Sequence, residues 1–135
     1  MIDIDKTAAN QYSPLALAFL GDAVYSELVR EMILRRANMP ARKLHKLSVG
    51  KVCAAYQARA YLLIKEILTD EESDILRRGR NSGGNEHHIP KNSDHTEYSR
   101  ATALETLFGW LKLIGDDDRI NELFNYIIER NTDEK

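Results

Sequence analysis

Asp22 and Glu105 are two acidic residues that stand in otherwise apolar stretches far apart in the chain. Asp22 interrupts the run LALAFLGDAVY, residues 15–25, and Glu105 lies within ATALETLFG, residues 101–109. A carboxylate in apolar surroundings is costly unless hydrogen bonds, a basic partner or a metal ion compensate it. The sequence therefore predicts a specific partner for Asp22 in the fold, and Glu105 is the candidate.

A glycine accompanies each of these acids. Gly21 directly precedes Asp22, and Gly109 follows Glu105 by one helical turn. Glycine inside a helix costs about 1 kcal/mol relative to alanine, so both positions need a structural reason. Close approach of two helix backbones is such a reason, and it would bring the two carboxylates together in a dry setting.

Two carboxylates in a dry setting cannot both stay ionised without a cation. A magnesium ion fits, because it takes one or two protein carboxylates and keeps several waters, one of which can attack a phosphate. The alternative is that the acids are unrelated and that each caps a helix or pairs with a nearby arginine, since ion-pair networks mimic functional sites.

Helical patterns dominate the chain, and no segment shows a convincing strand pattern. Ser13 and Pro14 are typical of a helix start, and Thr69 and Glu72 form a capping box. Apolar residues surround the first helix for nearly two turns, which predicts that it is buried. Ser48 is a candidate cap for a long helix. The predicted helices cover residues 14–36, 40–47, 48–67, 69–78, 94–113 and 116–128.

The longest predicted loop runs from Gly79 to about Asn92, where glycine, asparagine and proline disfavour regular structure. Loops of this length in compact domains are often functional. His87 and His88 lie in it, but no third ligand follows at a usual metal-site spacing.

The net charge of −2 conceals an uneven distribution of charge. Residues 30–65 carry nine basic residues and one acidic residue, whereas residues 66–76 carry five acids and no base. Such polarisation can form a basic face for a polyanion. The alternative is a set of solvated helix faces, because exposed charges contribute little.

The length of 135 residues predicts a single domain, residues 1–135, that is large enough for a real core. The one cysteine, Cys53, excludes an internal disulfide and a cysteine-based zinc site, and we expect a buried, inert thiol in a reducing cytoplasm. The N-terminal residues lack the features of a signal peptide, and no segment has the roughly 18 apolar residues of a membrane span.

Two motifs of this chain are similar to those of the ribonuclease III family. LAFLGDAV, residues 17–24, resembles the signature of the catalytic domain, and ETLFG, residues 105–109, resembles the second motif. The order and spacing of these motifs fit the domain over nearly the whole chain. The length resembles the Mini-ribonuclease III branch, which consists of the catalytic domain without a double-stranded-RNA-binding domain.

This resemblance implies an all-α fold, the helical bundle of the ribonuclease III endonuclease domain, assembled as a homodimer. It implies a magnesium-dependent endoribonuclease that cleaves double-stranded RNA and matures the ends of precursor 23S ribosomal RNA, with ribosomal proteins on assembly intermediates as further partners. Asp22 and Glu105 would be the catalytic residues and the Mg²⁺ ligands. The residues expected to contact RNA phosphates are Arg77, Arg78, Arg80, Asn81 and Lys91.

The chain also departs from the longer enzymes that it resembles. Those enzymes place acids where this sequence has Ala18, Thr102 and, in a middle helix, Ala54. Fewer carboxylates imply simpler metal occupancy. The alternatives are a non-catalytic RNA-binding or scaffolding protein of the same fold, and a helical interaction domain whose basic segment meets an acidic partner.

Overall fold

The computed structural model describes residues 4–83 and 94–131 of the chain. These residues form α-helices and no strand, which confirms the predicted all-α class. The helices in order are α1 Lys6–Ala9, α2 Pro14–Arg36, α3 Ala41–Val52, α4 Ala54–Ile64, α5 Asp70–Gly83, α6 His95–Leu113 and α7 Asp117–Arg130.

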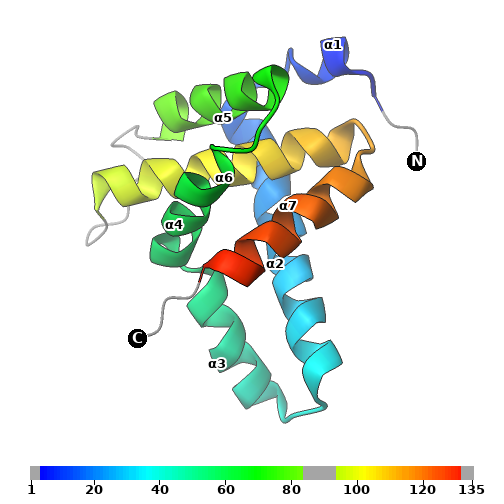
Figure 1. Ribbon diagram of the computed structural model, residues 1–135, viewed down its shortest axis with the longest axis vertical. Helices are drawn as coiled ribbons and strands as arrows, with labels where there is room; N and C mark the ends of the chain where they lie inside the picture. The colour runs from blue at the N-terminus through cyan, green and yellow to red at the C-terminus, as the bar shows by residue number, and fades with distance from the viewer. Residues whose placement is uncertain (1–3, 84–93, 132–135) are drawn as a thin grey trace.

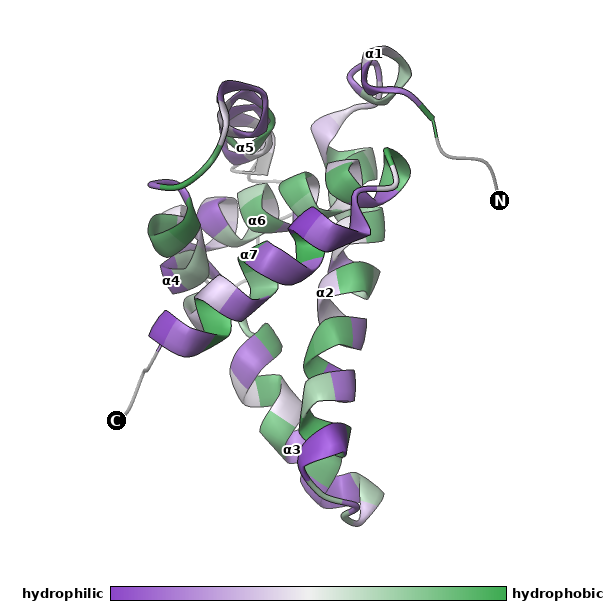
Figure 2. Cartoon of the chain, turned by 45° about the vertical axis from the view of Figure 1, so that its right-hand side comes forward, coloured by the Kyte–Doolittle hydropathy of each residue, from purple (hydrophilic) through white to green (hydrophobic). Residues whose placement is uncertain are grey.

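Helix α6 is the centre of the bundle. It packs against α2, α4, α5 and α7, and Figure 1 shows it crossing the middle of the molecule. Its side chains Leu104, Leu107 and Phe108 are fully buried, and Phe108 meets the Tyr25 ring of α2 edge-on at 5.7 Å. Figure 2 shows the hydrophobic character of α6 against the hydrophilic surface of α5. The burial of α6 stabilises it, and its packing against four helices fixes the position of the backbone that carries Glu105.

Helix α2 begins where the sequence predicts, because the Ser13 side chain accepts a hydrogen bond from the Ala16 amide at 3.2 Å. The prediction that its first turns are buried all round is wrong. Leu17 and Val24 face the core, but Leu15 is 40% exposed and Phe19 is 84% exposed. The helix therefore has an apolar face that the other described helices leave uncovered.

Two predicted boundaries in the middle of the chain are also wrong. Ser48 does not cap a long helix; it lies inside α3, where its hydroxyl donates to the His45 carbonyl at 2.8 Å. The break falls at Cys53, whose extended backbone separates α3 from α4. Cys53 is exposed at this junction rather than buried in a helix. A serine can bond its own helix as readily as it can cap the next one, so its type alone did not locate the boundary.

Helix α5 continues past the predicted end at Arg78 to Gly83. Gly79 belongs to this helix and packs against α6, where a Cβ atom would lie 2.6 Å from Thr106 Oγ1. The glycine that predicted a loop is instead a site of close helix packing. The remainder of the predicted loop, with His87, His88 and Lys91, lies outside the described residues.

The start of α5 is tied to α7 by a buried ion pair. Thr69 and Glu72 form the predicted capping box, with bonds of 3.0 and 3.2 Å. Arg119 of α7 donates to both Glu72 carboxylate oxygens, at 2.8 and 2.9 Å. Burial disfavours the ionised carboxylate, but hydrogen bonds from Arg119 and Thr69 outweigh it and hold the pKa of Glu72 below its usual value.

None of the described helices combines the length and the apolar character needed to cross a membrane.

Candidate active site

Helices α2 and α6 touch at their backbones, and Gly21 and Gly109 make this contact possible. A Cβ atom on Gly21 would lie 1.7 Å from the Glu105 carbonyl oxygen, and one on Gly109 would lie 1.9 Å from the Leu17 carbonyl oxygen. Side chains cannot be accommodated at such distances. The two glycines therefore allow the helices to approach closely enough for Asp22 of α2 to lie near Glu105 of α6.

Asp22 and Glu105 meet at this crossing, and their side chains share a hydrogen bond. Glu105 is half-buried beside the α2 backbone, whereas Asp22 is exposed. Desolvation of Glu105, followed by the nearby charge of Asp22 and the shared hydrogen bond, raises the pKa of Glu105 to about 8. Without a cation the pair therefore holds a proton at neutral pH.

The predicted pairing of the two acids is present in the structure, but their burial differs from expectation. The sequence pattern predicts a dry setting for both carboxylates, whereas in the fold Glu105 is half-buried and Asp22 is exposed. Asp22 is therefore the member of the pair that solvent reaches.

Gln57 of α4 is a third polar group at this crossing that the sequence analysis did not single out. Its side chain is buried, with 2% exposure, and its amide nitrogen donates to the Val52 carbonyl at 3.1 Å. Gln57 also acts to lower the pKa of Glu105, against the larger effect of burial. A signal was available, because Gln57 is an uncharged polar residue in the otherwise mostly apolar segment AAYQARAYLLI.

Tyr25 of α2 is a buried tyrosine whose pKa responds to the same carboxylate. Burial, followed by the neighbouring Tyr56, Cys53 and Glu105, raises the pKa of Tyr25 above its usual value. The Tyr25 ring packs edge-on against Phe108 and Phe124.

The donor set at the crossing fits a hard divalent cation. Among residues 4–83 and 94–131, no cluster of three or more histidine, cysteine, aspartate or glutamate side chains is present. Two carboxylates with the remaining positions filled by water is the arrangement that Mg²⁺ commonly accepts. The raised pKa of Glu105 also indicates a site suited to a cation, because a cation bound here would replace the shared proton.

Four of the five residues expected to contact RNA lie on the second half of α5, and the fifth, Lys91, lies outside the described residues. Arg80 and Asn81 are exposed there. Arg77 pairs with Asp74, and Arg78 donates to the Tyr12 carbonyl at 3.2 Å, so both have intramolecular partners. The structure places Arg80 and Asn81 on a rigid helix rather than in the flexible loop that the glycines indicated.

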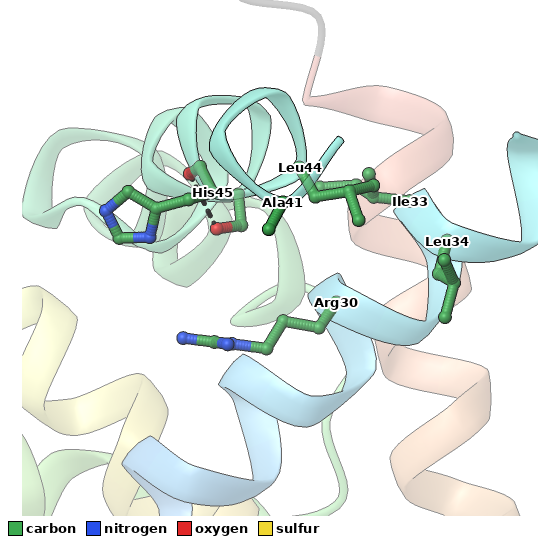
Figure 3. A pocket seen from close by; sticks show the side chains of 7 residues that line it. Arg30, Ile33, Leu34, Ala41, Leu44 and His45 are labelled. Carbon is green, nitrogen blue, oxygen red and sulfur yellow. Dashed lines mark hydrogen bonds between the residues drawn. The ribbon is translucent and has the colours of Figure 1, made fainter. Parts of the chain in front are cut away.

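A second basic region is formed by the end of α2 and by α3, which project from the bundle as a hairpin (Figure 1). Arg42, Lys43 and Lys46 are exposed on α3. A pocket of about 310 Å³ opens between the two helices, with Arg30 extending along it (Figure 3). Much of the positive segment 30–65 is therefore gathered on one protruding element.

The chain matches the family model described as the Ribonuclease III domain over residues 15–116, which include both acids and both glycines. The chain belongs to the ribonuclease III family. It is therefore an endoribonuclease, and the ribonuclease III family acts on double-stranded RNA.

Similar members of the ribonuclease III family span nearly the same length. The Mini-ribonuclease 3 of Thermoanaerobacter sp. is 39% identical over 93% of this chain and 87% of its own. That of Staphylococcus aureus is 41% identical over 86% of this chain and 87% of its own. A crystal structure of a Fusobacterium nucleatum protein superposes with a TM-score of 0.79 at 33% identity, covering 88% of this chain and 93% of that one.

Proposed function

We propose that this chain is a magnesium-dependent endoribonuclease that matures the ends of precursor 23S ribosomal RNA. The observation that carries the catalytic part is the hydrogen-bonded pair of Asp22 and Glu105 at the backbone contact of α2 and α6. The resemblance of the chain to the Mini-ribonuclease III branch supports the ribosomal substrate. The whole chain would act as one catalytic domain in the cytoplasm.

The two carboxylates have different tasks in this proposal. Glu105 on the buried helix α6 and the exposed Asp22 on α2 would hold the metal ion through their carboxylate oxygens. A bound Mg²⁺ supplies charge neutralisation and lowers the pKa of water. Hydrolysis adds the water oxygen to phosphorus and breaks the bond from phosphorus to the 3′ oxygen. The products are a 5′-phosphate and a 3′-hydroxyl.

The uncovered apolar face of α2 supports a homodimer. Phe19 and Leu15 are one turn apart on α2, and Tyr12 just before the helix is 45% exposed. An aromatic side chain that is 84% exposed and stands three residues from Asp22 is costly in water unless a partner covers it. A second copy would cover this face and place one site near each strand of a duplex. Sedimentation of the purified chain measures this assembly.

The RNA would be held through its phosphates rather than through its bases. Arg77, Arg80 and Asn81 of α5 are exposed members of the predicted set, Arg77 with its ion pair to Asp74. Lys91 is a further candidate in sequence. The basic hairpin of α2 and α3 extends the positive surface. Such contacts recognise the shape and charge of an A-form duplex. Ribosomal proteins on assembly intermediates are candidate additional partners.

Cleavage of duplex RNA by matched variants tests the catalytic assignment. Asp22→Asn and Glu105→Gln should abolish magnesium-dependent cleavage while helicity and assembly remain. Glu27→Gln is the matched control, because Glu27 is an exposed acid farther along α2. Full activity of either site variant would overturn the assignment, and RNA binding without cleavage by the unmodified chain would favour the scaffolding alternative.

A choice of substrates tests the ribosomal part separately. The proposal expects faster cleavage of a duplex formed by the two ends of precursor 23S ribosomal RNA than of an unrelated duplex of equal length. Equal rates on the two duplexes, alone and on ribosomal assembly intermediates, would remove the 23S assignment and leave the nuclease assignment intact.

A further inference from the structure

We infer that the basic hairpin, residues 30–52 at the end of α2 and in α3, is a docking surface for an acidic segment of a partner protein that also carries apolar side chains. The inference goes beyond the nuclease activity and does not depend on the metal site. It rests on two properties that coincide on this hairpin, which are uncovered apolar side chains and positive charge without acidic neighbours in sequence.

Large apolar side chains are exposed mainly in two places on the described residues. One is the start of α2, the face assigned above to a homodimer. The other is the basic hairpin, where Leu34, Leu47 and Val49 are 54%, 44% and 46% exposed. Ser48 is the only buried residue of α3, so the apolar side chains of this helix are largely free to contact a partner. Grouped apolar exposure of this kind marks an interaction surface.

Pockets open on different faces of α3, with volumes of about 310, 210 and 490 Å³. Leu34 and Leu44 line the first pocket, and Leu47 lines the second and the third. The pockets follow the whole of α3, which has 12 residues and is therefore about 18 Å long. Such a surface is longer than one small molecule requires, and it suits a peptide segment.

Positive charge surrounds these pockets. Residues 32–65 contain no acidic residue. Arg30 extends between the two helices (Figure 3), and Arg42, Lys43 and Lys46 line the pocket of about 490 Å³. Within residues 4–83 and 94–131, none of these four cations forms an ion pair. The charge that complements this surface is therefore negative and must come from a ligand.

The apolar side chains distinguish the basic hairpin from a surface that serves RNA alone. An RNA duplex presents phosphates and ribose hydroxyls, which bury little against Leu34 or Leu47. An acidic peptide matches both properties, because its carboxylates face the lysines and arginines while its apolar side chains enter the pockets. A helical peptide with apolar residues at three- and four-residue spacing would present them along such a surface.

Binding of a synthetic peptide to the isotope-labelled full-length chain tests this assignment. The probe is a helical peptide of glutamate, alanine and leucine, with its leucines at three- and four-residue spacing. Amide shifts in nuclear magnetic resonance spectra should change mainly within residues 30–52. Fluorescence anisotropy gives the affinity, which Leu34→Ser and Leu47→Ser should each lower about tenfold. Both side chains are exposed, so these variants should fold.

Matched variants elsewhere separate the basic hairpin from the rest of the surface. Leu62→Ser is the apolar control, because Leu62 lies on α4 and is 42% exposed. Lys43→Gln should lower the affinity about two- to fivefold, whereas Lys112→Gln, at an exposed lysine of α6, should leave it unchanged. Asp22→Asn should bind the peptide like the unmodified chain, so loss of the nuclease site does not affect this test.

The other occupants give different results. A second peptide with serine in place of leucine keeps the negative charge, and equal binding of the two peptides would overturn the inference because charge alone would then suffice. If a short RNA duplex changes the shifts of residues 30–52, the peptide does not, and Leu34→Ser weakens RNA binding, the surface serves RNA. If Leu34→Ser changes the sedimentation of the chain alone, the surface joins two copies, which also overturns the inference.

Discussion

Replacing Glu105 with glutamine should stabilise the metal-free protein while it removes metal binding. The carboxyl of Glu105 has a pKa of about 8 in the fold, against an ordinary value of 4.5. A group whose pKa is raised on folding binds its proton more tightly in the folded state. Its favourable contribution is complete below the ordinary pKa and is lost as the pH rises toward 8. Glutamine carries no such penalty, because it stays neutral at every pH.

The size of this effect follows from the two pKa values. Each pH unit between them costs the folded protein about 1.4 kcal/mol. The metal-free chain should therefore lose about 1 kcal/mol by pH 5, about 3 kcal/mol by pH 7 and close to 5 kcal/mol above pH 8. Between pH 5 and pH 7 the free energy of unfolding of Glu105→Gln should rise relative to that of the unmodified chain by about 2 kcal/mol.

Urea unfolding in the presence of a chelator at pH 5, 6, 7 and 8 measures this difference. Protomer concentration must be equal in all samples, because the stability of an oligomer depends on it. Added Mg²⁺ should stabilise the unmodified chain by about 2.7 kcal/mol at a hundred times the dissociation constant and should leave Glu105→Gln unchanged. Parallel pH profiles for the two proteins would refute the buried, proton-sharing pair.

Three further predictions follow from contacts in and around the site. Gly21→Ala should destabilise the protein by about 3 kcal/mol or more in urea unfolding, because its Cβ would lie 1.7 Å from the Glu105 carbonyl oxygen. Gly50→Ala is the control, because a Cβ there has nothing within 4 Å, and it should be neutral or slightly stabilising. Equal changes in the free energy of unfolding for the two variants would contradict the close contact at Gly21. Glu72→Gln should lower the free energy of unfolding by about 1–3 kcal/mol at pH 7. Since the pKa of Glu72 is lowered, the difference in stability between the two proteins should shrink as the pH falls below the ordinary carboxyl pKa. A difference that stays constant with pH would argue against the pair with Arg119. The apparent affinity for Mg²⁺, measured by calorimetry, should increase about tenfold per pH unit up to about pH 8 and then level off, because Mg²⁺ binding displaces one proton from Glu105. An affinity that does not change with pH would show that no proton is displaced.

The pairing of the two acids could be predicted because each stands beside a glycine whose cost needed an explanation. Helix-interior Gly21 and Gly109 indicated close packing, and the structure shows their backbones in contact. Similar reasoning from local chemistry located the cap at Ser13 and the capping box of Thr69 and Glu72, where side chains accept from free amides. Such features depend on a few neighbouring residues, so the sequence contains the information for them.

Features that depend on distant partners could not be predicted in the same way. Gly79 has the chemistry of a loop residue, and only its packing against Thr106 of α6 explains why it is helical. The break at Cys53 and the exposure of Phe19 are likewise decided by what lies beside them in space. Gln57 could have been noticed as a polar residue in an apolar helix, but Glu105, whose pKa it helps to lower, is 48 positions away in the sequence.

The number of carboxylates at the crossing is consistent with a single divalent cation. Ala18 and Thr102, which stand where the longer enzymes that this chain resembles have acids, are buried, with exposures of 7% and 6%. The Thr102 backbone carbonyl accepts a hydrogen bond from the Thr106 hydroxyl at 2.8 Å. Ionised acids at these two places would double the negative charge in a poorly solvated region and would require a second cation. Asp22 and Glu105 together carry two negative charges, so one Mg²⁺ neutralises them, and without it one shared proton reduces the pair to a single charge.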